Sequence, residues 1–130
     1  MPNLVDSDWV IPYLHGDSDA VRLLEQLAPQ GIGISIISYM EVYDGLAREA
    51  DPQQAEADLQ AFLTTVPIFP LTLAVARRCA ALRQALRAQG RRVGSRALDL
   101  IVAATALEHG LTLVTRNTAD YRDIPGLQLG

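Results

Sequence analysis

The sequence contains no lysine, because all 11 of its basic residues are arginine. A catalytic lysine base, a lysine Schiff base and the phosphate-binding lysine of a Walker-type loop are therefore excluded. Cysteine is almost as scarce, and the single Cys79 cannot form a disulfide within the chain. It is interpreted as a small packed side chain. This cysteine usage favours a cytoplasmic location.

The chain also lacks a long apolar run. No segment approaches the roughly 20 apolar residues of a membrane-spanning helix, so no membrane association is predicted. The opening MPNLVDSD has no basic stretch followed by an apolar one, and we do not expect it to be a signal peptide. With 130 residues, of which 49% are hydrophobic, the chain is expected to form one domain over residues 1–130.

Charge is distributed unevenly along the chain. Residues 1–70 carry 2 arginines and 11 acids, a net charge of −9, whereas residues 71–130 carry 9 arginines and 4 acids, a net charge of +5. A partner that carries phosphates is therefore expected to approach the second half.

Short apolar runs alternate with segments of helical spacing. Strands are predicted over residues 3–6, 31–37, 67–71 and 111–115, with an edge strand at 127–129. Helices are predicted over residues 18–28, 38–50, 51–66, 72–90 and 96–110. Such alternation predicts an α/β fold of three layers, in which helices cover both faces of a mostly parallel sheet of four to five short strands.

Helix caps refine two of these elements. Ser38 is expected to cap the helix over 38–50, with Glu41 three residues later completing a capping box. Asp51 and Pro52 occupy the cap and the first position of the next helix.

Acidic and amide side chains recur at the carboxyl ends of the predicted strands. Asp6 ends the first strand, Glu41 is placed in the first turn after the second, and Asn117 and Asp120 follow the strand 111–115. Asp99 lies in the first turn of the apolar helix that leads into that strand. Because this helix runs antiparallel to the strands, all five side chains are expected at one edge of the sheet, where open α/β sheets bind ligands.

Carboxylates that converge at one edge repel one another unless a cation lies between them. Mg²⁺ or Mn²⁺ is the predicted cofactor, since both prefer oxygen ligands and can activate a water molecule next to a phosphodiester. This explains why Asp99 is tolerated at the head of a buried helix. Taken singly, Asp6 and Glu41 could instead be helix caps and Asp120 a turn residue.

Three other acids are interpreted as surface residues: Asp8, Asp44 and Asp123. Asp44 is spaced to pair with Arg48 one helical turn later.

Three segments carry a family resemblance: LVDSDWVIPYLHG, ISIISYMEVYDGL and RALDLIVAATALEHGLTLVTRNTADY. Together they span nearly the whole chain. The sequence resembles the PIN-domain family, specifically the VapC-type toxins of bacterial and archaeal toxin–antitoxin systems. That likeness implies a PIN-like nuclease domain with endoribonuclease activity, a cognate antitoxin that blocks the site, and a homodimer.

The resemblance also implies roles for individual residues. It assigns metal binding and catalysis to Asp6, Glu41, Asp99 and Asp120. It assigns supporting polar roles to Ser7, Thr115 and Asn117. Many family members have an acid where this chain has Asn117, so Asp120 is expected to carry more of the role at a second metal position.

RNA must reach this acidic edge past other acids, so nearby arginines are expected to bind its phosphates. The candidates precede Asp99 or follow the strand 111–115: Arg91, Arg92, Arg96 and Arg116. Apolar candidates on residues 38–64 form a predicted antitoxin groove, with core packing as the alternative. These candidates are Tyr39, Val42, Tyr43, Leu46 and Phe62.

Two other functions fit parts of the sequence. The motif DSDWV matches the opening of a haloacid-dehalogenase-like phosphatase, with Asp6 as nucleophile and Asp8 as acid, although the expected lysine is absent. A receiver domain is excluded on the same ground. A non-catalytic PIN-like binding module is the third alternative, and retention of all four acids argues against it.

Overall fold

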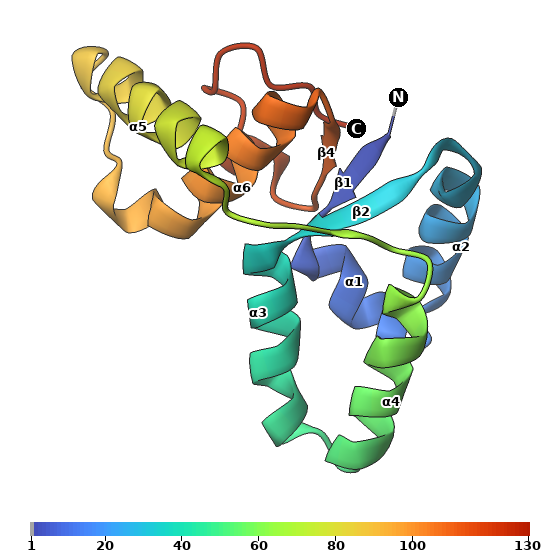
Figure 1. Cartoon of the computed structure of the whole chain (residues 1–130). Coiled ribbons are helices and arrows are strands. Elements are labelled where there is room, and N and C mark those ends of the chain that lie inside the picture. Colours follow the sequence, from blue (N-terminus) through green and yellow to red (C-terminus); the bar gives the residue numbers. More distant parts are fainter. Residues whose placement is uncertain (1) are drawn as a thin grey trace.

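The computed structural model describes residues 2–130 and contains a parallel sheet with the strand order β3–β2–β1–β4 (Figure 1). The strands are β1 (Asn3–Val5), β2 (Ile32–Ser35), β3 (Ile68–Phe69) and β4 (Thr112–Val114). All pairings in this sheet are parallel. The predicted edge strand at 127–129 is reduced to a single parallel bridge between Leu113 and Leu129.

Helices lie on both faces of the sheet, which confirms the predicted α/β architecture (Figure 1). They are α1 (Ser7–Leu14), α2 (Ser18–Leu27), α3 (Ile36–Gly45), α4 (Pro52–Leu63), α5 (Leu73–Ala88) and α6 (Ala97–His109). Short 3₁₀ turns follow or precede them: η1 (Ala28–Gln30), η2 (Leu46–Arg48), η3 (Gly94–Arg96) and η4 (Thr118–Asp120). None of the described helices is long and apolar enough to cross a membrane.

The sheet separates two apolar cores. Successive residues of β1 point to opposite faces, so Leu4 packs with the side chains of α5 and α6. Val5 packs with side chains of α1 and α2 on the other face. Helix α6 contributes six buried residues, in agreement with its apolar sequence.

Helix α1 follows β1 without a connecting loop. Asp6 has an extended backbone, with φ −76° and ψ 158°, and its side chain accepts a hydrogen bond from the Ser7 amide. The same arrangement recurs after β2, where Ser35 caps α3. Two cap residues thus stand at the carboxyl ends of neighbouring strands, and the site is built around them.

The predicted cap of the second of these helices is wrong. Ser35 Oγ accepts a hydrogen bond from the Ser38 amide at 3.0 Å, so the cap of α3 is Ser35, three residues before Ser38. The strand ends sooner than its apolar run suggests, and the helix starts at Ile36. Glu41 therefore lies in the second turn and completes no capping box, whereas Asp51 does cap α4 as predicted.

Candidate functional site

Asp6 lies at the centre of the candidate site. Its side chain is 8% exposed and both carboxylate oxygens are engaged. Oδ1 accepts from the Ser7 amide at 2.9 Å and from the Ser38 hydroxyl at 3.4 Å. Oδ2 accepts from the Thr115 hydroxyl at 2.9 Å. Residues from three elements therefore fix this carboxylate at the carboxyl edge of the sheet.

The electrostatic environment of Asp6 disfavours its charge. Burial raises its pKa to about 6 from an ordinary value of 3.8, and the neighbouring carboxylates of Asp8 and Glu41 act in the same direction. The hydrogen bonds from Thr115 and Ser7 oppose this rise without cancelling it. Functional sites commonly contain a buried acid that is repelled by neighbouring acids, because a bound cation or proton relieves this repulsion.

Asp8 anchors the loop that follows β4. Its Oδ2 accepts from the Arg116 amide at 2.9 Å, from Asn117 Nδ2 at 3.2 Å and from Thr115 Oγ1 at 3.0 Å. Its Oδ1 is buried and has no hydrogen-bond partner. The interpretation of Asp8 as a surface acid is therefore wrong. Its position two residues after Asp6, in the first turn of α1, was the available sequence signal.

Glu41 joins the site through Ser7. The Ser7 hydroxyl donates to Glu41 Oε1 at 2.9 Å, which links the first turn of α1 to the second turn of α3. The structure thus brings Asp6, Ser7, Glu41, Thr115 and Asn117 into one hydrogen-bonded network, with Asp8 as an additional member.

Asp99 approaches the network through a residue that the sequence did not single out. Tyr121 is 2% exposed, and its pKa is raised above its ordinary value by burial and then by the charges of Asp6, Asp99 and Asp8. The Tyr121 hydroxyl is buried and has no hydrogen-bond partner within residues 2–130. Its place directly after Asp120 was the only sequence signal.

Asp120 lies at an exposed position at the end of η4, and its carboxylate forms no hydrogen bond or ion pair within residues 2–130. It lines an open hollow of about 480 Å³ instead. The residues of this hollow are Arg91, Arg96, Ala119, Asp120, Arg122 and Asp123. Asp120 stays a predicted metal ligand.

Arg96 forms hydrogen bonds with other residues of the protein. It binds Asp123 through two hydrogen bonds of 2.8 Å each and donates to the Asp120 carbonyl oxygen at 2.7 Å. These bonds lower the pKa of Asp123 and raise that of Arg96. Asp123 is half-buried in this clamp rather than a free surface acid, and the clamp ties the loop before α6 to η4. Asp44, in contrast, is exposed and pairs with Arg48 as predicted.

The other predicted phosphate contacts are exposed. The Arg116 guanidinium lies 4.1 Å from the ring centroid of Trp9 and 3.8 Å from the Asp17 carboxylate. Arg91 reaches Asp123 at 3.9 Å. Arg92 forms no ion pair with any residue of the described part of the chain. Among the predicted phosphate contacts, Arg92 is thus the one whose guanidinium pairs with no carboxylate of the described residues.

The carboxylate oxygens of this site are suitable ligands for a hard divalent cation such as Mg²⁺. Within residues 2–130 no three His, Cys, Asp or Glu side chains are gathered into a ready-made metal site. Mg²⁺ does not require one, because it retains several water ligands and binds through one or two carboxylates. The like-charge repulsion around Asp6 and the unpaired Asp8 Oδ1 show that this edge has more carboxylate oxygens than hydrogen-bond donors to pair with them.

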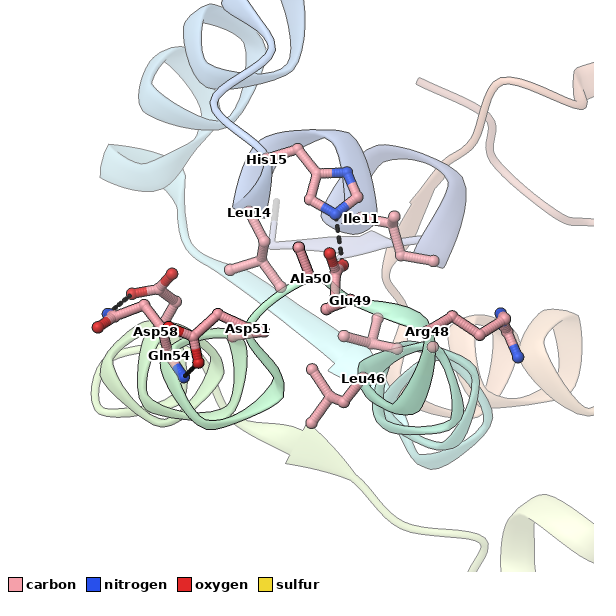
Figure 2. A pocket seen from close by; sticks show the side chains of 13 residues that line it. Ile11, Leu14, His15, Leu46, Arg48, Glu49, Ala50, Asp51, Gln54 and Asp58 are labelled. Carbon is pink, nitrogen blue, oxygen red and sulfur yellow. Dashed lines mark hydrogen bonds and ion pairs between the residues drawn. The ribbon is translucent and has the colours of Figure 1, made fainter.

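A second hollow, of about 440 Å³, lies between α1, the end of α3 and α4 (Figure 2). Val42 and Leu46 line it, although both are buried rather than exposed as the groove prediction required. Figure 2 shows His15 pointing across one side of the hollow towards Glu49, with which it forms an ion pair or hydrogen bond depending on its protonation. Of the predicted groove residues, Tyr43 is exposed, and Tyr39 and Phe62 are half-buried.

Comparison with known protein families identifies the family of this chain. The family model described as "PIN domain" matches residues 4–127. The chain belongs to the PIN domain family. The family that the sequence motifs indicated is thereby confirmed.

Relatives of this PIN domain include VapC proteins. The tRNA(fMet)-specific endonuclease VapC of Shigella flexneri is 30% identical over 125 residues, which cover 96% of this chain and 93% of the relative. Ribonuclease VapC2 of Rickettsia felis is 31% identical over 107 residues, which cover 82% and 78% of the two chains.

Solved structures share the fold of this PIN domain over its length. A chain of VapBC2 from Rickettsia felis, bound to a DNA fragment from its promoter, has a TM-score of 0.86 and 26% identity, and the match covers 100% of this chain and 98% of that one. A chain of a toxin–antitoxin complex from Klebsiella pneumoniae has a TM-score of 0.74 and 34% identity, with coverages of 96% and 94%.

Proposed function

We propose that this PIN domain is a metal-dependent endoribonuclease and the toxin of a type II toxin–antitoxin pair. The observation that carries the proposal is the buried Asp6 carboxylate, which accepts hydrogen bonds from Ser7, Ser38 and Thr115 and lies near the acids Asp8 and Glu41 at the sheet edge. The names of the VapC relatives, which are an endonuclease and a ribonuclease, support the same reaction.

Each residue has a distinct role in this proposal. Asp6, Glu41 and Asp99 would hold Mg²⁺ or Mn²⁺, one or two of them directly and the others through its water ligands, and the bound ion would supply activation of water and stabilise charge on the phosphodiester. The Ser7 hydroxyl orients Glu41 through its 2.9 Å hydrogen bond. The Thr115 hydroxyl orients Asp6 and also touches Asp8, so it connects the two acids of α1 to β4.

The first prediction tests the acidic site. Asp6→Asn and Asp99→Asn should each reduce RNA cleavage by at least about a hundredfold, because metal catalysis contributes several kcal/mol and each ~1.4 kcal/mol changes a rate tenfold. Cleavage of a tRNA preparation, followed on gels with Mg²⁺ or with chelator, measures the effect. The matched control is Asp44→Asn, an exposed acid on α3.

Two outcomes would count against the proposal. Full cleavage by Asp6→Asn in the presence of metal would remove Asp6 from the site, and full cleavage by the parent protein in chelator would refute the metal dependence. A phosphatase reaction is disfavoured by Asp8, whose Oδ2 accepts three hydrogen bonds and whose Oδ1 is buried, so it is poorly placed to act as an acid.

The antitoxin is proposed to bind at the 440 Å³ hollow between α1, α3 and α4 (Figure 2). The structural neighbours from Rickettsia felis and Klebsiella pneumoniae are toxin–antitoxin complexes, which supports a protein partner. The hollow offers an apolar lining of Ile11, Leu14, Val42, Leu46 and Ala55. An apolar helix face suits such a groove.

The second prediction tests this docking site with two alanines on α4. Ala55 lines the hollow and is half-buried, whereas Ala57 is exposed and does not line it. Ala55→Arg should abolish co-purification with the co-expressed antitoxin, while Ala57→Arg should leave it intact. Cleavage by each purified variant confirms that it is folded. Retention of the antitoxin by an active Ala55→Arg variant would place the partner elsewhere.

A further inference from the structure

The loop that follows β4 holds an arginine over an aromatic ring. The Arg116 guanidinium lies over Trp9, with Cζ 4.1 Å from the centroid of the ring. Trp9 is half-buried and packs against the apolar core on the α1 side of the sheet, so its ring is a rigid support. The loop backbone is fixed as well, because the Arg116 amide donates to Asp8 Oδ2 at 2.9 Å. Both the side chain and the backbone of Arg116 are thus held in place.

This arrangement contributes little to the stability of the fold. The Arg116 side chain remains 44% exposed, and its 3.8 Å contact with the Asp17 carboxylate is too long for a hydrogen bond. Exposed cation–π contacts and exposed ion pairs are both weak in water. Because Trp9 covers one face of the planar guanidinium, the exposed part of the group is its outer face and its N–H donors.

The exposed face lies beside the carboxylates of the candidate site. Trp9 is three residues after Asp6, about 4.5 Å along the axis of α1, and its amide donates to the Asp6 carbonyl oxygen at 3.1 Å. Arg116 directly follows Thr115, whose hydroxyl donates to the Asp6 carboxylate at 2.9 Å. A nucleotide next to the one bound at Asp6 can therefore reach the Trp9–Arg116 stack.

We infer that the Trp9–Arg116 stack is a base-binding subsite, at which an unpaired RNA base stacks on the outer face of the guanidinium while its N–H groups bind the adjoining phosphate. The inference rests on the proposed ribonuclease function. Unpaired bases are commonly bound by stacking on arginine planes and aromatic rings. This role extends that of Arg116 from a phosphate contact to the binding of a base, and it adds Trp9 as the support of the guanidinium.

The experiment introduces Arg116→Lys into an Asp99→Asn reference protein, which should not cleave. Lysine keeps the positive charge but has no planar face. The probes are a short oligoadenylate and an abasic ribose-phosphate oligomer of equal length, with Mg²⁺ present. The reference protein should bind oligoadenylate about five- to a hundredfold more tightly, which is the contribution of one stacked base. Arg116→Lys should lose most of this preference and keep the salt dependence, because its charge is unchanged.

Two controls locate the effect. Trp9 is the only tryptophan of the chain, so tryptophan fluorescence should change more when oligoadenylate binds than when the abasic oligomer binds. Arg22→Lys alters an exposed arginine of α2 that pairs with Asp19, and it should keep the preference of the reference protein. Thermal unfolding of Arg116→Lys verifies that this variant is folded.

The possible failures of the inference and of the proposed function are distinguishable. A reference protein without a preference for oligoadenylate, or one that binds a tRNA preparation and neither oligomer, would overturn the inference alone. A folded Arg116→Lys protein that keeps the full preference would do the same. A reference protein that binds neither oligomer nor the tRNA preparation would refute the proposed ribonuclease function and the inference with it.

Discussion

Asp6 serves local structure and the site with the same carboxylate. As the N-cap of α1 it accepts from the Ser7 amide, which favours the charged form. Burial and the charges of Asp8 and Glu41 favour the neutral form and prevail. Sequence reasoning located Asp6 because its position after a strand is readable. It could not weigh Asp8, because nothing in DSDWV shows that the loop after β4 donates to Asp8.

The pH dependence of stability follows from this balance. The pKa of Asp6 rises from 3.8 to about 6 on folding, so between these values the folded state binds the proton more tightly than the unfolded state does. The stability from this group is therefore present below about pH 4 and lost as the pH rises through about 6. Its size is on the order of 3 kcal/mol at most, at ~1.4 kcal/mol per pKa unit.

The third prediction compares Asp6→Asn with the parent protein in chelator. Asparagine still caps α1 but carries no charge. At about pH 7 the variant should have the higher free energy of unfolding in urea, and the difference should shrink towards about pH 4, where the parent Asp6 is protonated. A difference that stays constant over this range would contradict the raised pKa.

At the scale of elements, the alternation of apolar runs and helical periods was sufficient to predict the sheet and the helices α2 to α6, whereas no helix was predicted over the residues of α1 (Ser7–Leu14). Element boundaries were less readable. Ser35 and Ser38 are both good caps, and the choice depends on where β2 stops pairing with β3, a tertiary contact. The Arg96–Asp123 clamp was equally inaccessible, because it joins residues 27 positions apart on two loops.

The fourth prediction separates the two serines at the start of α3. Ser35→Ala should lower the free energy of unfolding by about 1 kcal/mol, because it leaves the Ser38 amide without its cap. Both variants lose the 3.2 Å hydrogen bond that the Ser35 hydroxyl donates to the Ser38 hydroxyl. Ser38→Ala keeps the cap and additionally loses only the longer, 3.4 Å bond to Asp6, so its effect should be smaller. Urea unfolding of both variants measures the difference. A larger loss in Ser38→Ala would restore Ser38 as the cap.

At the scale of the molecule, the uneven charge distribution predicts that RNA would bind to the arginine-rich half. Residues 71–130 carry a net charge of +5, and helices α5 and α6 of this half pack together (Figure 1). The predicted phosphate contacts differ in their availability to RNA, because Arg96 forms an ion pair with Asp123 whereas Arg92 is exposed. The homodimer implied by the family resemblance remains a prediction.

The fifth prediction concerns salt. Arg92→Ala should weaken RNA binding similarly across sequences and reduce the logarithmic salt dependence by about 0.7, the value for one phosphate contact to a single strand. Binding is measured with metal present in an Asp99→Asn protein, which should not cleave. Arg22→Ala, an exposed arginine of the acidic half, is the control. Equal salt slopes for the parent, Arg92→Ala and Arg22→Ala proteins would move the RNA path away from this loop.

The strand order has a consequence for the protein while it is being synthesised. Strand β1 lies between β2 and β4, so the first strand to be synthesised can pair on both sides only after the last strand has been synthesised (Figure 1). The hydrogen bond between Thr115 and Asp6 likewise joins residues 109 positions apart. Long-range parallel pairing forms late, because its loop-closure entropy precedes its contacts. A nascent chain that has emerged only as far as α6 has Asp6, Glu41 and Asp99 but no β4 to complete the sheet beside them. Ribosome-bound fragments should therefore be inactive, which would delay toxicity until translation of this chain is nearly finished.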